Sequence, residues 1–308
     1  MKIYEGINNF KRLDYAVVTS GTYDGVHIGH QKILQRMIEV AKFNGGESVL
    51  ISFWPHPRMV LNNETGFLKL INTMDEKQEL LRKIGINHLI LIPFTREFAQ
   101  TSSEDFIRNI LVEAIGTKKL IIGYNHRFGK NREGSFDSLV KDSHKYGFEV
   151  EEIPKHEIDH IGISSTIIRK SLTNGDIITA EKYLGHPFIL DGLVIHGDKL
   201  GSTIGFPTAN LQIEEAYKLI PGDGVYAVKV NIEGDKYHGM LNIGYRPTVD
   251  GLNRKIEVHI LDFNKKIYEM KICIKFVQKI RDEKKFESLD HLKQQLVKDK
   301  SIISAILR

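Results

Sequence analysis

Residues 21–30 read Gly-Thr-Tyr-Asp-Gly-Val-His-Ile-Gly-His, a combination suited to binding phosphate. Both imidazoles, His27 and His30, can donate hydrogen bonds to oxygens of a triphosphate, and Gly29 between them leaves room for a nucleotide to approach the backbone. The apolar run before this segment predicts a strand, and the spacing after it predicts a helix. A helix N-terminus adds free N–H groups and partial positive charge. We predict a nucleotide site here; an incidental histidine pair or a metal site is the alternative.

A second segment, residues 163–169, reads Ile-Ser-Ser-Thr-Ile-Ile-Arg and begins a short helix after another predicted strand. Its hydroxyl groups and helix N-terminus are suited to the β- and γ-phosphates, and Arg169 to the charge that builds on leaving pyrophosphate. Taken alone, the segment is an ordinary helix cap. In-line attack at the α-phosphorus of a triphosphate needs mainly positioning and charge stabilisation, which both segments together would supply.

The C-terminal half contains a glycine-rich stretch at residues 197–210. It is not a Walker loop, because no Gly-Lys-Ser/Thr follows the glycines. Gly197, Gly201 and Gly205 permit a backbone path that wraps an anion. Thr208 and Asn210 offer oxygen atoms to a hard cation such as Mg²⁺. The alternative is a glycine-rich hairpin loop in a barrel.

Glu257 lies in a strand-like run with Ile256, Val258 and Ile260 on one face and His259 beside it on the other. A carboxylate that faces a pocket from a strand can take a proton from an attacking hydroxyl. A glutamate that faces solvent from a strand is the alternative.

The elements that position these residues differ between the two halves of the chain. Short β-rich runs at residues 15–19, 48–53, 88–94, 119–123 and 148–153 alternate with helical stretches. One helix follows His30, a second opens with a capping box from Thr73 to Glu76, and a third extends from near Ser102 to Gly116. Near-continuous apolar strands separated by helices predict a parallel sheet covered on both faces, a Rossmann-like α/β domain.

From about residue 186 the chain reads as strands joined by short loops, at residues 188–197, 224–232, 237–244, 255–262 and 268–277. The last segment is helical, with Ser288 as its cap and Leu289, Leu292, Leu296 and Ile302 on one face. This order predicts a small antiparallel β-barrel with a terminal helix. We therefore divide the chain into domains 1–184 and 185–308.

Length and composition agree with two globular domains. A chain of 308 residues exceeds the usual size of one domain, and its 41% hydrophobic residues exclude wholesale disorder. The net charge of +4 fits an anionic ligand or simple solubility. Cys273 is the lone cysteine, so no disulfide framework is expected. No apolar run reaches the ~20 residues of a membrane span, and the N-terminus lacks a signal-peptide pattern. We expect a cytoplasmic protein without membrane partners, either a monomer or a weak homo-oligomer.

The N-terminal motifs together resemble the adenylyltransferase domain of prokaryotic bifunctional riboflavin kinase/FAD synthetases. Residues 21–30, 52–57, 123–129 and 163–169 occur in the order of that family. The resemblance implies that ATP is the donor, FMN the acceptor, and FAD and pyrophosphate the products.

The resemblance also implies roles for single residues. His27 and His30 would contact the ATP phosphates, Asn125 would lie near the flavin phosphate and the reacting centre, and His56 would lie at the mouth of the site. The remaining nucleotide-binding residues would be Gly21, Tyr23, Asp24, Gly29, Ser164, Ser165, Thr166 and Arg169. His126 stands where many relatives carry an aromatic residue.

The C-terminal motifs resemble the riboflavin kinase module, at residues 205–210, 224–227, 242–248, 256–259 and 281–286. The resemblance implies transfer of a phosphoryl group from Mg-ATP to the 5′-hydroxyl of riboflavin. Thr208 and Asn210 would hold Mg²⁺ and phosphate, Glu257 would be the base, and the ATP loop would comprise Gly197, Lys199, Gly201 and Gly205.

One residue departs from the pattern of the kinase relatives. Ser202 stands where they usually carry arginine, and losing such a charge-assisted contact would slow the kinase roughly 10- to 100-fold. Lys199 is the residue able to replace that charge.

Three hypotheses follow. The leading one is a two-step enzyme that makes FMN in the barrel and FAD in the N-terminal domain. The second keeps FAD synthesis alone, with the barrel as a flavin-binding or regulatory module. The third is a nucleic-acid-binding protein, because His-x-Gly-His also marks class I tRNA synthetases. That hypothesis requires a basic stripe, whereas residues 281–285 alternate in charge, so we expect no nucleic-acid partner.

Overall fold

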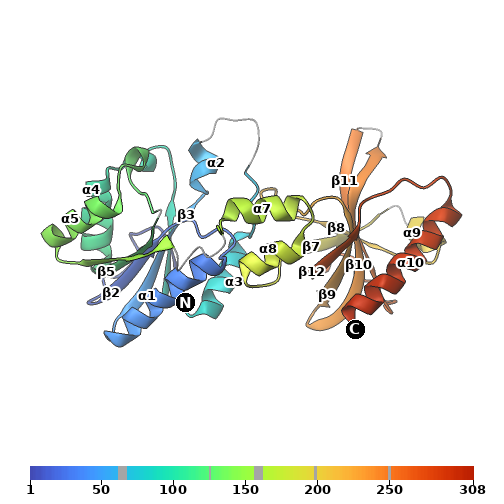
Figure 1. Ribbon diagram of the computed structural model, residues 1–308, viewed down its shortest axis with the longest axis horizontal. Coiled ribbons are helices and arrows are strands. Elements are labelled where there is room, and N and C mark those ends of the chain that lie inside the picture. Colours follow the sequence, from blue (N-terminus) through green and yellow to red (C-terminus); the bar gives the residue numbers. More distant parts are fainter. Residues whose placement is uncertain (62–67, 125, 156–161, 198–199, 249–250) are drawn as a thin grey trace. The chain divides into compact units, whose positions relative to one another are not determined.

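The computed structural model describes residues 1–61, 68–124, 126–155, 162–197, 200–248 and 251–308. By packing, the chain forms two compact units, Met1–Ser165 and Thr166–Arg308, which are described separately (Figure 1). The predicted functional boundary between residues 184 and 185 lies further along the chain than this division and stays a prediction.

The first unit is built on a parallel sheet with the strand order β1-β4-β3-β2-β5-β6. Its strands are β1 (Lys2–Glu5), β2 (Ala16–Ser20), β3 (Glu47–Trp54), β4 (His88–Pro93), β5 (Thr117–Gly123) and β6 (Glu149–Ile153). From β2 the chain adds strands on one side through β3 and β4, then returns to the other side of β2 with β5. The order reverses between β2 and β5, where open α/β sheets bind their ligands.

Helices cover both faces of this sheet (Figure 1). The helices of this unit are α1 (Ile28–Phe43), α2 (Pro57–Leu61), α3 (Met74–Ile84), α4 (Ser103–Asp105), α5 (Phe136–Tyr146), the π-helical segment η2 (Phe106–Ile115), and the 3₁₀ turns η1 (Phe98–Gln100) and η3 (Lys130–Arg132). In β2, Val17 packs in a core cluster with α1 and α3, whereas Ala16 and Val18 pack with η2 and α5. This alternation follows from the two-residue period of a strand.

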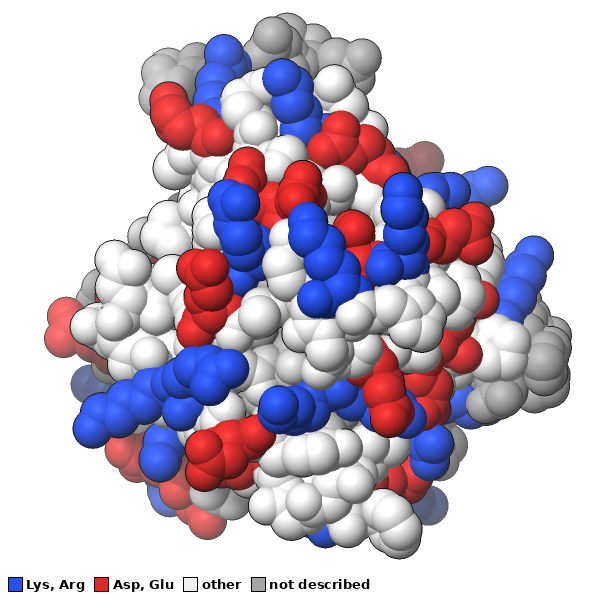
Figure 2. All heavy atoms as spheres, turned by 90° about the vertical axis from the view of Figure 1, so that its left-hand side faces the viewer, with Lys and Arg blue, Asp and Glu red and all other residues white. Residues whose placement is uncertain are grey.

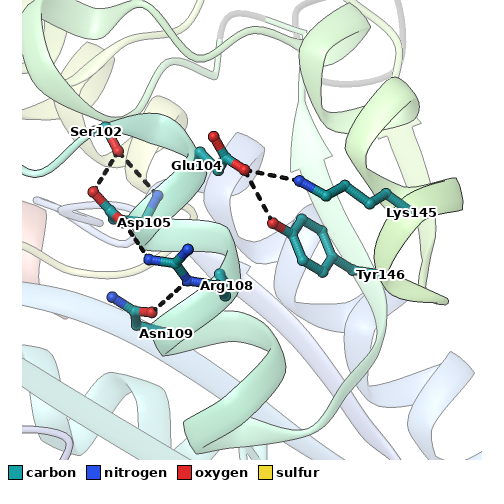
Figure 3. A network of polar contacts seen from close by, with 7 residues as sticks. All are labelled: Ser102, Glu104, Asp105, Arg108, Asn109, Lys145 and Tyr146. Atoms are coloured by element: carbon teal, nitrogen blue, oxygen red, sulfur yellow. Dashed lines mark hydrogen bonds and ion pairs between the residues drawn. The ribbon is translucent and has the colours of Figure 1, made fainter.

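A polar network joins α4 to α5 on the surface (Figure 3). Glu104 accepts hydrogen bonds from Lys145 Nζ at 2.8 Å and from Tyr146 Oη at 3.3 Å. Asp105 accepts from the Ser102 hydroxyl at 2.7 Å and from Arg108 at 2.7 Å. These exposed contacts fix the start of η2, and η2 supplies Phe106 to the site described below.

The second unit is a closed antiparallel barrel with the strand order β10-β11-β8-β7-β12-β9. Its strands are β7 (Ile189–Ile195), β8 (Ala209–Gln212), β9 (Gly224–Ile232), β10 (Asp235–Thr248), β11 (Gly251–Ile260) and β12 (Lys271–Arg281). Its helices are α7 (Ser165–Thr173), which starts at the last residue of the first unit, α8 (Ile177–Leu184), α9 (Leu200–Thr203) and α10 (Leu289–Leu307).

Helix α10 packs on the barrel through Ile303 and Leu307, and Ser288 caps it as predicted. The predicted apolar face was right in part: Leu296 packs against the barrel core, and Leu292 is half-buried. It was wrong for Leu289 and Ile302, which are exposed, and the fully buried Asp299 lies on the inner face. The single Nε–H of Arg281 is shared between the two carboxylate oxygens of Asp299, at 2.9 and 3.2 Å, and Nη2 donates to Oδ2 at 2.8 Å. The charged pair therefore sets the orientation of the helix.

The predicted fold class is confirmed in both halves: a parallel sheet covered by helices, then an antiparallel barrel with a terminal helix. Among the described residues no helix is both long and apolar enough to cross a membrane.

Candidate functional site

A cavity of about 570 Å³ opens at the carboxyl ends of the parallel strands, where the strand order reverses. Ser20 and Gly21 at the end of β2, Phe53 of β3, and Gly123 of β5 line it. Its volume is typical of small-molecule sites. His30 and His56 line the same cavity, so the structure brings these two predicted residues together with Gly21 and Tyr23.

The two histidines of the first motif stack on each other at the start of α1. Their ring centroids are 3.6 Å apart, with 17° between the planes. His27 is the N-cap of the helix, and its Nδ1 accepts a hydrogen bond from the His30 backbone N–H at 3.3 Å. The neutral His27 ring therefore carries its proton on Nε2, from which it can donate. Gly29 is buried within the same turn.

His30 is held as a neutral ring. Burial, the neighbouring His27 and the cation of Lys77 lower the pKa of His30 well below its usual value. Among the described residues, the buried Nδ1 of His30 has no hydrogen-bond partner. A buried polar atom without a partner is costly, and a bound ligand can supply that partner.

The loop before α1 has an unusual backbone. Tyr23 has φ of 49°, Gly25 of 86° and Val26 of 39°. Positive φ is unfavourable for residues other than glycine and persists where surrounding contacts hold it. The Tyr23 hydroxyl bonds Thr19 at 2.9 Å, and the buried Asp24 carboxylate accepts from the Ile71 backbone N–H at 2.9 Å. Asp24 thus holds the loop in place.

Of the other predicted nucleotide-binding residues, His56, Ser164 and Ser165 lie in the first unit. His56 is buried at the start of α2, and its Nδ1 accepts from the Arg58 backbone N–H at 3.1 Å. The Ser165 hydroxyl donates to the Asp24 carbonyl oxygen at 2.8 Å, which ties the second motif to the first, and Ser164 precedes it. Asn125 lies outside the described residues. Thr166 and Arg169 belong to the second unit, so their roles at the ATP phosphates stay predictions.

Sequence reasoning missed the aromatic lining of the cavity, formed by Phe53, Phe94, Phe98, Phe106 and Phe128. Phe53 is the penultimate residue of β3 and Phe94 directly follows β4, so the positions of the strand ends carried a signal for these two.

His126 also lines the cavity, 3.3 Å from Ser20 Oγ. Burial lowers the pKa of His126 to about 4, so the ring is neutral at neutral pH. A neutral imidazole serves as a flat ring much as an aromatic residue does, and it stacks near Phe128 at 5.8 Å and 23°.

Lys77 of α3 was also missed. It is 8% exposed, and its Nζ donates to the Thr22 carbonyl oxygen at 3.1 Å and to Ser52 Oγ at 3.4 Å. Burial lowers the pKa of Lys77 to about 8, and Asp24 partly opposes this effect. No local motif in the sequence marks this lysine.

In the barrel, Asn210 of β8 lies directly opposite Glu257 of β11. Residues directly opposite in an antiparallel ladder place their side chains on the same face. Glu257 is 8% exposed, so the alternative of a solvent-facing glutamate was wrong. The neighbouring His259 Nδ1 lies 2.7 Å from the Pro207 carbonyl oxygen, which fixes the chain just before Thr208.

A cavity of about 340 Å³ is lined by Gly197, Ser202, Thr208 and Asn210, but not by Glu257. A Cβ at Gly197 would lie 2.0 Å from the Asn210 amide nitrogen, so only glycine fits beside that side chain. Gly205 has φ of 85°, and a Cβ at Gly201 would lie 2.3 Å from the Phe206 carbonyl oxygen.

The predicted Lys199 lies outside the described residues. Two other lysines, Lys265 and Lys266, line the same cavity, and sequence reasoning had not singled them out.

The fold and the first cavity together define an α/β nucleotide-binding protein, with stacked histidines at a helix N-terminus beside the point where the strand order reverses. Residues 10–167 match the FAD synthetase family, and residues 184–307 match the riboflavin kinase family. The chain belongs to the family of bifunctional riboflavin kinase/FMN adenylyltransferases.

Individual relatives agree over nearly the whole chain. The bifunctional riboflavin kinase/FMN adenylyltransferase of Listeria monocytogenes is 39% identical over 284 residues, covering 92% of this chain and 90% of the relative. That of Escherichia coli is 37% identical over 302 residues, covering 97% and 96%. A crystal structure from Streptococcus pneumoniae, described as a macrolide-efflux protein, is 31% identical with a TM-score of 0.89 and covers 98% of both chains.

Proposed function

We propose that this chain makes FAD from riboflavin in two ATP-dependent steps. The C-terminal unit phosphorylates riboflavin to FMN, and the N-terminal unit transfers the adenylyl group of ATP to FMN. One observation carries the second step: the stacked pair His27 and His30 lies at a helix N-terminus beside a cavity lined by aromatic rings. Phosphate groups suit the first feature, and a flat flavin ring suits the second.

In adenylyl transfer, a phosphate oxygen of FMN attacks the α-phosphorus of ATP. The bond from that phosphorus to the oxygen bridging to the β-phosphate breaks, and pyrophosphate leaves with the electron pair. His27 and His30 donate to phosphate oxygens, and the His30 Nδ1 gains a partner there. Asn125 orients the flavin phosphate near the reacting centre. The hydroxyls of Ser164 and Thr166 and the guanidinium of Arg169 hold the departing phosphates, while the Ser165 hydroxyl holds its segment on the Asp24 carbonyl oxygen.

In the kinase reaction, Glu257 takes the proton of the riboflavin 5′-hydroxyl, whose oxygen attacks the γ-phosphorus of ATP, and ADP leaves. Thr208 and Asn210 line one cavity, and a hydroxyl and an amide oxygen are hard donors that would fit Mg²⁺. The ion neutralises phosphate charge when bound. Ser202 lines this cavity, and Lys265 and Lys266 bring two positive charges to it in place of the arginine of relatives.

The second candidate is a chain that makes only FAD, with a barrel that merely binds flavin. The burial of Glu257 opposite Asn210 favours a working kinase over this candidate.

We also propose that the enzyme acts in the cytoplasm, as a monomer or weak homo-oligomer. The face drawn in Figure 2 mixes Lys and Arg with Asp and Glu, so it shows no basic stripe for nucleic acid.

The test is chromatography of flavins after the protein is incubated with riboflavin, ATP and Mg²⁺. We expect FMN first and FAD afterwards. Glu257→Gln should make no FMN from riboflavin but should still make FAD from supplied FMN, because the adenylyl site is intact. FMN formation by this variant at the wild-type rate would remove Glu257 as the base. FAD from supplied FMN without any FMN from riboflavin in the wild type would favour the second candidate.

A further inference from the structure

Lys77 is a buried cation that the two reactions above do not use. Lysines are rarely buried unless their charge is paired or has a role. Its ammonium donates to the Thr22 carbonyl oxygen at 3.1 Å and to Ser52 Oγ at 3.4 Å. Thr22 belongs to the loop before α1 and lines the first cavity, and Ser52 lies in β3. Lys77 therefore links α3 to two segments at the edge of the nucleotide site.

The loop that Lys77 contacts needs support from outside. Tyr23 and Val26 both have positive φ, which costs free energy and persists only where the surroundings fix it. Residues 71–77 supply part of this support, beside the contacts of Thr19 with Tyr23 and of Ser165 with Asp24. The backbone N–H groups of Ile71 and Asn72 donate to Asp24 Oδ1 at 2.9 and 3.4 Å. Asp24 follows Tyr23 in the chain, whereas Thr22, which Lys77 contacts, precedes it.

The local structure of α3 fixes the position of this lysine. Thr73 and Glu76 form a capping box at the helix start, and Lys77 lies in the turn that follows. The buried Asn72 donates from Nδ2 to Glu76 Oε2 at 3.2 Å. The first turn of α3 is thereby held on both sides, and Lys77 reaches the loop from a rigid base.

We infer that Lys77 is a positioning residue for adenylyl transfer, whose ammonium holds the Thr22 carbonyl so that the strained loop keeps His27 and His30 where they receive the ATP phosphates. The inference rests on the proposed FAD synthesis and adds a residue to it. The charge of Lys77 also reaches the pair, because it contributes to the lowered pKa of His30. A neutral side chain of similar length would fill the space but would neither donate to the carbonyl nor exert this field.

The experiment compares Lys77→Met and Lys77→Arg with Lys83→Met in the full-length chain. Lys83 lies on the same helix, is 69% exposed, and pairs only with Glu79 among the described residues. Adenylyl transfer is measured from supplied FMN, which gives kcat and separate KM values for ATP and FMN. Riboflavin kinase activity of each variant is measured as an internal control, and Trp54, the only tryptophan, reports unfolding of the first unit by fluorescence.

We expect Lys77→Met to lower kcat/KM for ATP about 10- to 100-fold, the loss typical of one charge-assisted hydrogen bond. The KM for FMN and the kinase activity should stay unchanged, and the Trp54 unfolding transition should come no earlier than in the wild type, because the variant no longer buries a charge. Lys77→Arg should recover most of the loss, and Lys83→Met should match the wild type.

Three results would overturn the inference. The first is a Lys77→Met variant with wild-type kinetics for ATP. The second is an equal loss of both activities with an earlier Trp54 transition, which would make the role purely structural. The third is a folded Lys77→Arg variant as impaired as Lys77→Met. A failure of the proposed function itself would give a different result from these three, because the wild-type chain would then make no FAD from FMN.

Discussion

His27 and His30 stack at 3.6 Å, so the charge of one ring opposes the charge of the other. Before ATP binds, His30 is neutral at neutral pH, because burial, His27 and Lys77 all lower its pKa. A bound triphosphate brings negative charge to the same place, and negative charge favours a protonated imidazole. The site is therefore expected to take up a proton when ATP binds.

Proton uptake can be measured by titration calorimetry of ATP binding in buffers that differ in ionisation enthalpy. At pH 7 we expect the binding enthalpy of the wild type to depend on the buffer, with net uptake of up to about one proton. His30→Gln, which remains polar but does not titrate, should lose most of this dependence. Equal buffer dependence in the two proteins would show that His30 does not gain a proton.

Lys77 illustrates why part of the site cannot be derived from local sequence. The His-x-Gly-His motif lies within one turn, and its chemistry could be predicted from spacing alone. Lys77 contacts Thr22 and Ser52 from 55 and 25 residues away. At neutral pH the folded protein holds this ammonium despite a pKa of about 8, against 10.5 in water. That difference corresponds to about 3 kcal/mol, a cost to stability that suggests a functional use.

At the scale of elements, the sequence predicted the strands of five or more residues but not the four-residue strands β1 and β8. The runs at β2, β3, β4 and β5 are apolar enough to be recognised, because both faces of a central parallel strand are covered. β1 and β8 have four residues each and few fully buried side chains, so their composition carries little signal. The aromatic lining needed the strand order, which brings the ends of β3, β4 and β5 together.

Helix α10 shows a different failure of periodicity. Apolar spacing placed Leu289 and Ile302 on the inner face, but Asp299 lies there and is fully buried against Arg281. A pair of charges across 18 residues overrides the apolar pattern, because a buried charge must keep its partner.

We therefore expect Asp299→Ala to destabilise the barrel strongly. Removing one member of a buried pair leaves the other charge without compensation, which costs about 3–5 kcal/mol. Urea unfolding followed by circular dichroism should show an earlier transition for this variant. Trp54 belongs to the first unit, so the unfolding midpoint followed by its fluorescence should stay at the wild-type urea concentration. Lys298→Ala, an exposed change on the same helix, is the control and should stay within about 0.5 kcal/mol of the wild type. An Asp299→Ala transition equal to that of the control would contradict the role of the pair.

At the scale of the whole molecule, two units with different folds carry two reactions that share ATP and FMN. Two features of the sequence indicated this organisation: the order of the motifs, and the change near residue 186 from alternating strands and helices to successive strands. The packing of the described residues then supplied the two cavities and the burial of Glu257. Each reaction has its own set of residues, so a change in one site is expected to leave the other reaction running.

The most direct test of the account is flavin chromatography of His30→Ala incubated with riboflavin, ATP and Mg²⁺. The alanine removes one of the two phosphate donors but leaves Thr208, Asn210 and Glu257 in place. We expect FMN to accumulate at the wild-type rate while FAD formation falls at least about 100-fold, as for loss of a donor that stabilises charge in the transition state. FAD formation at the wild-type rate would contradict the claim that this histidine pair holds the triphosphate for adenylyl transfer.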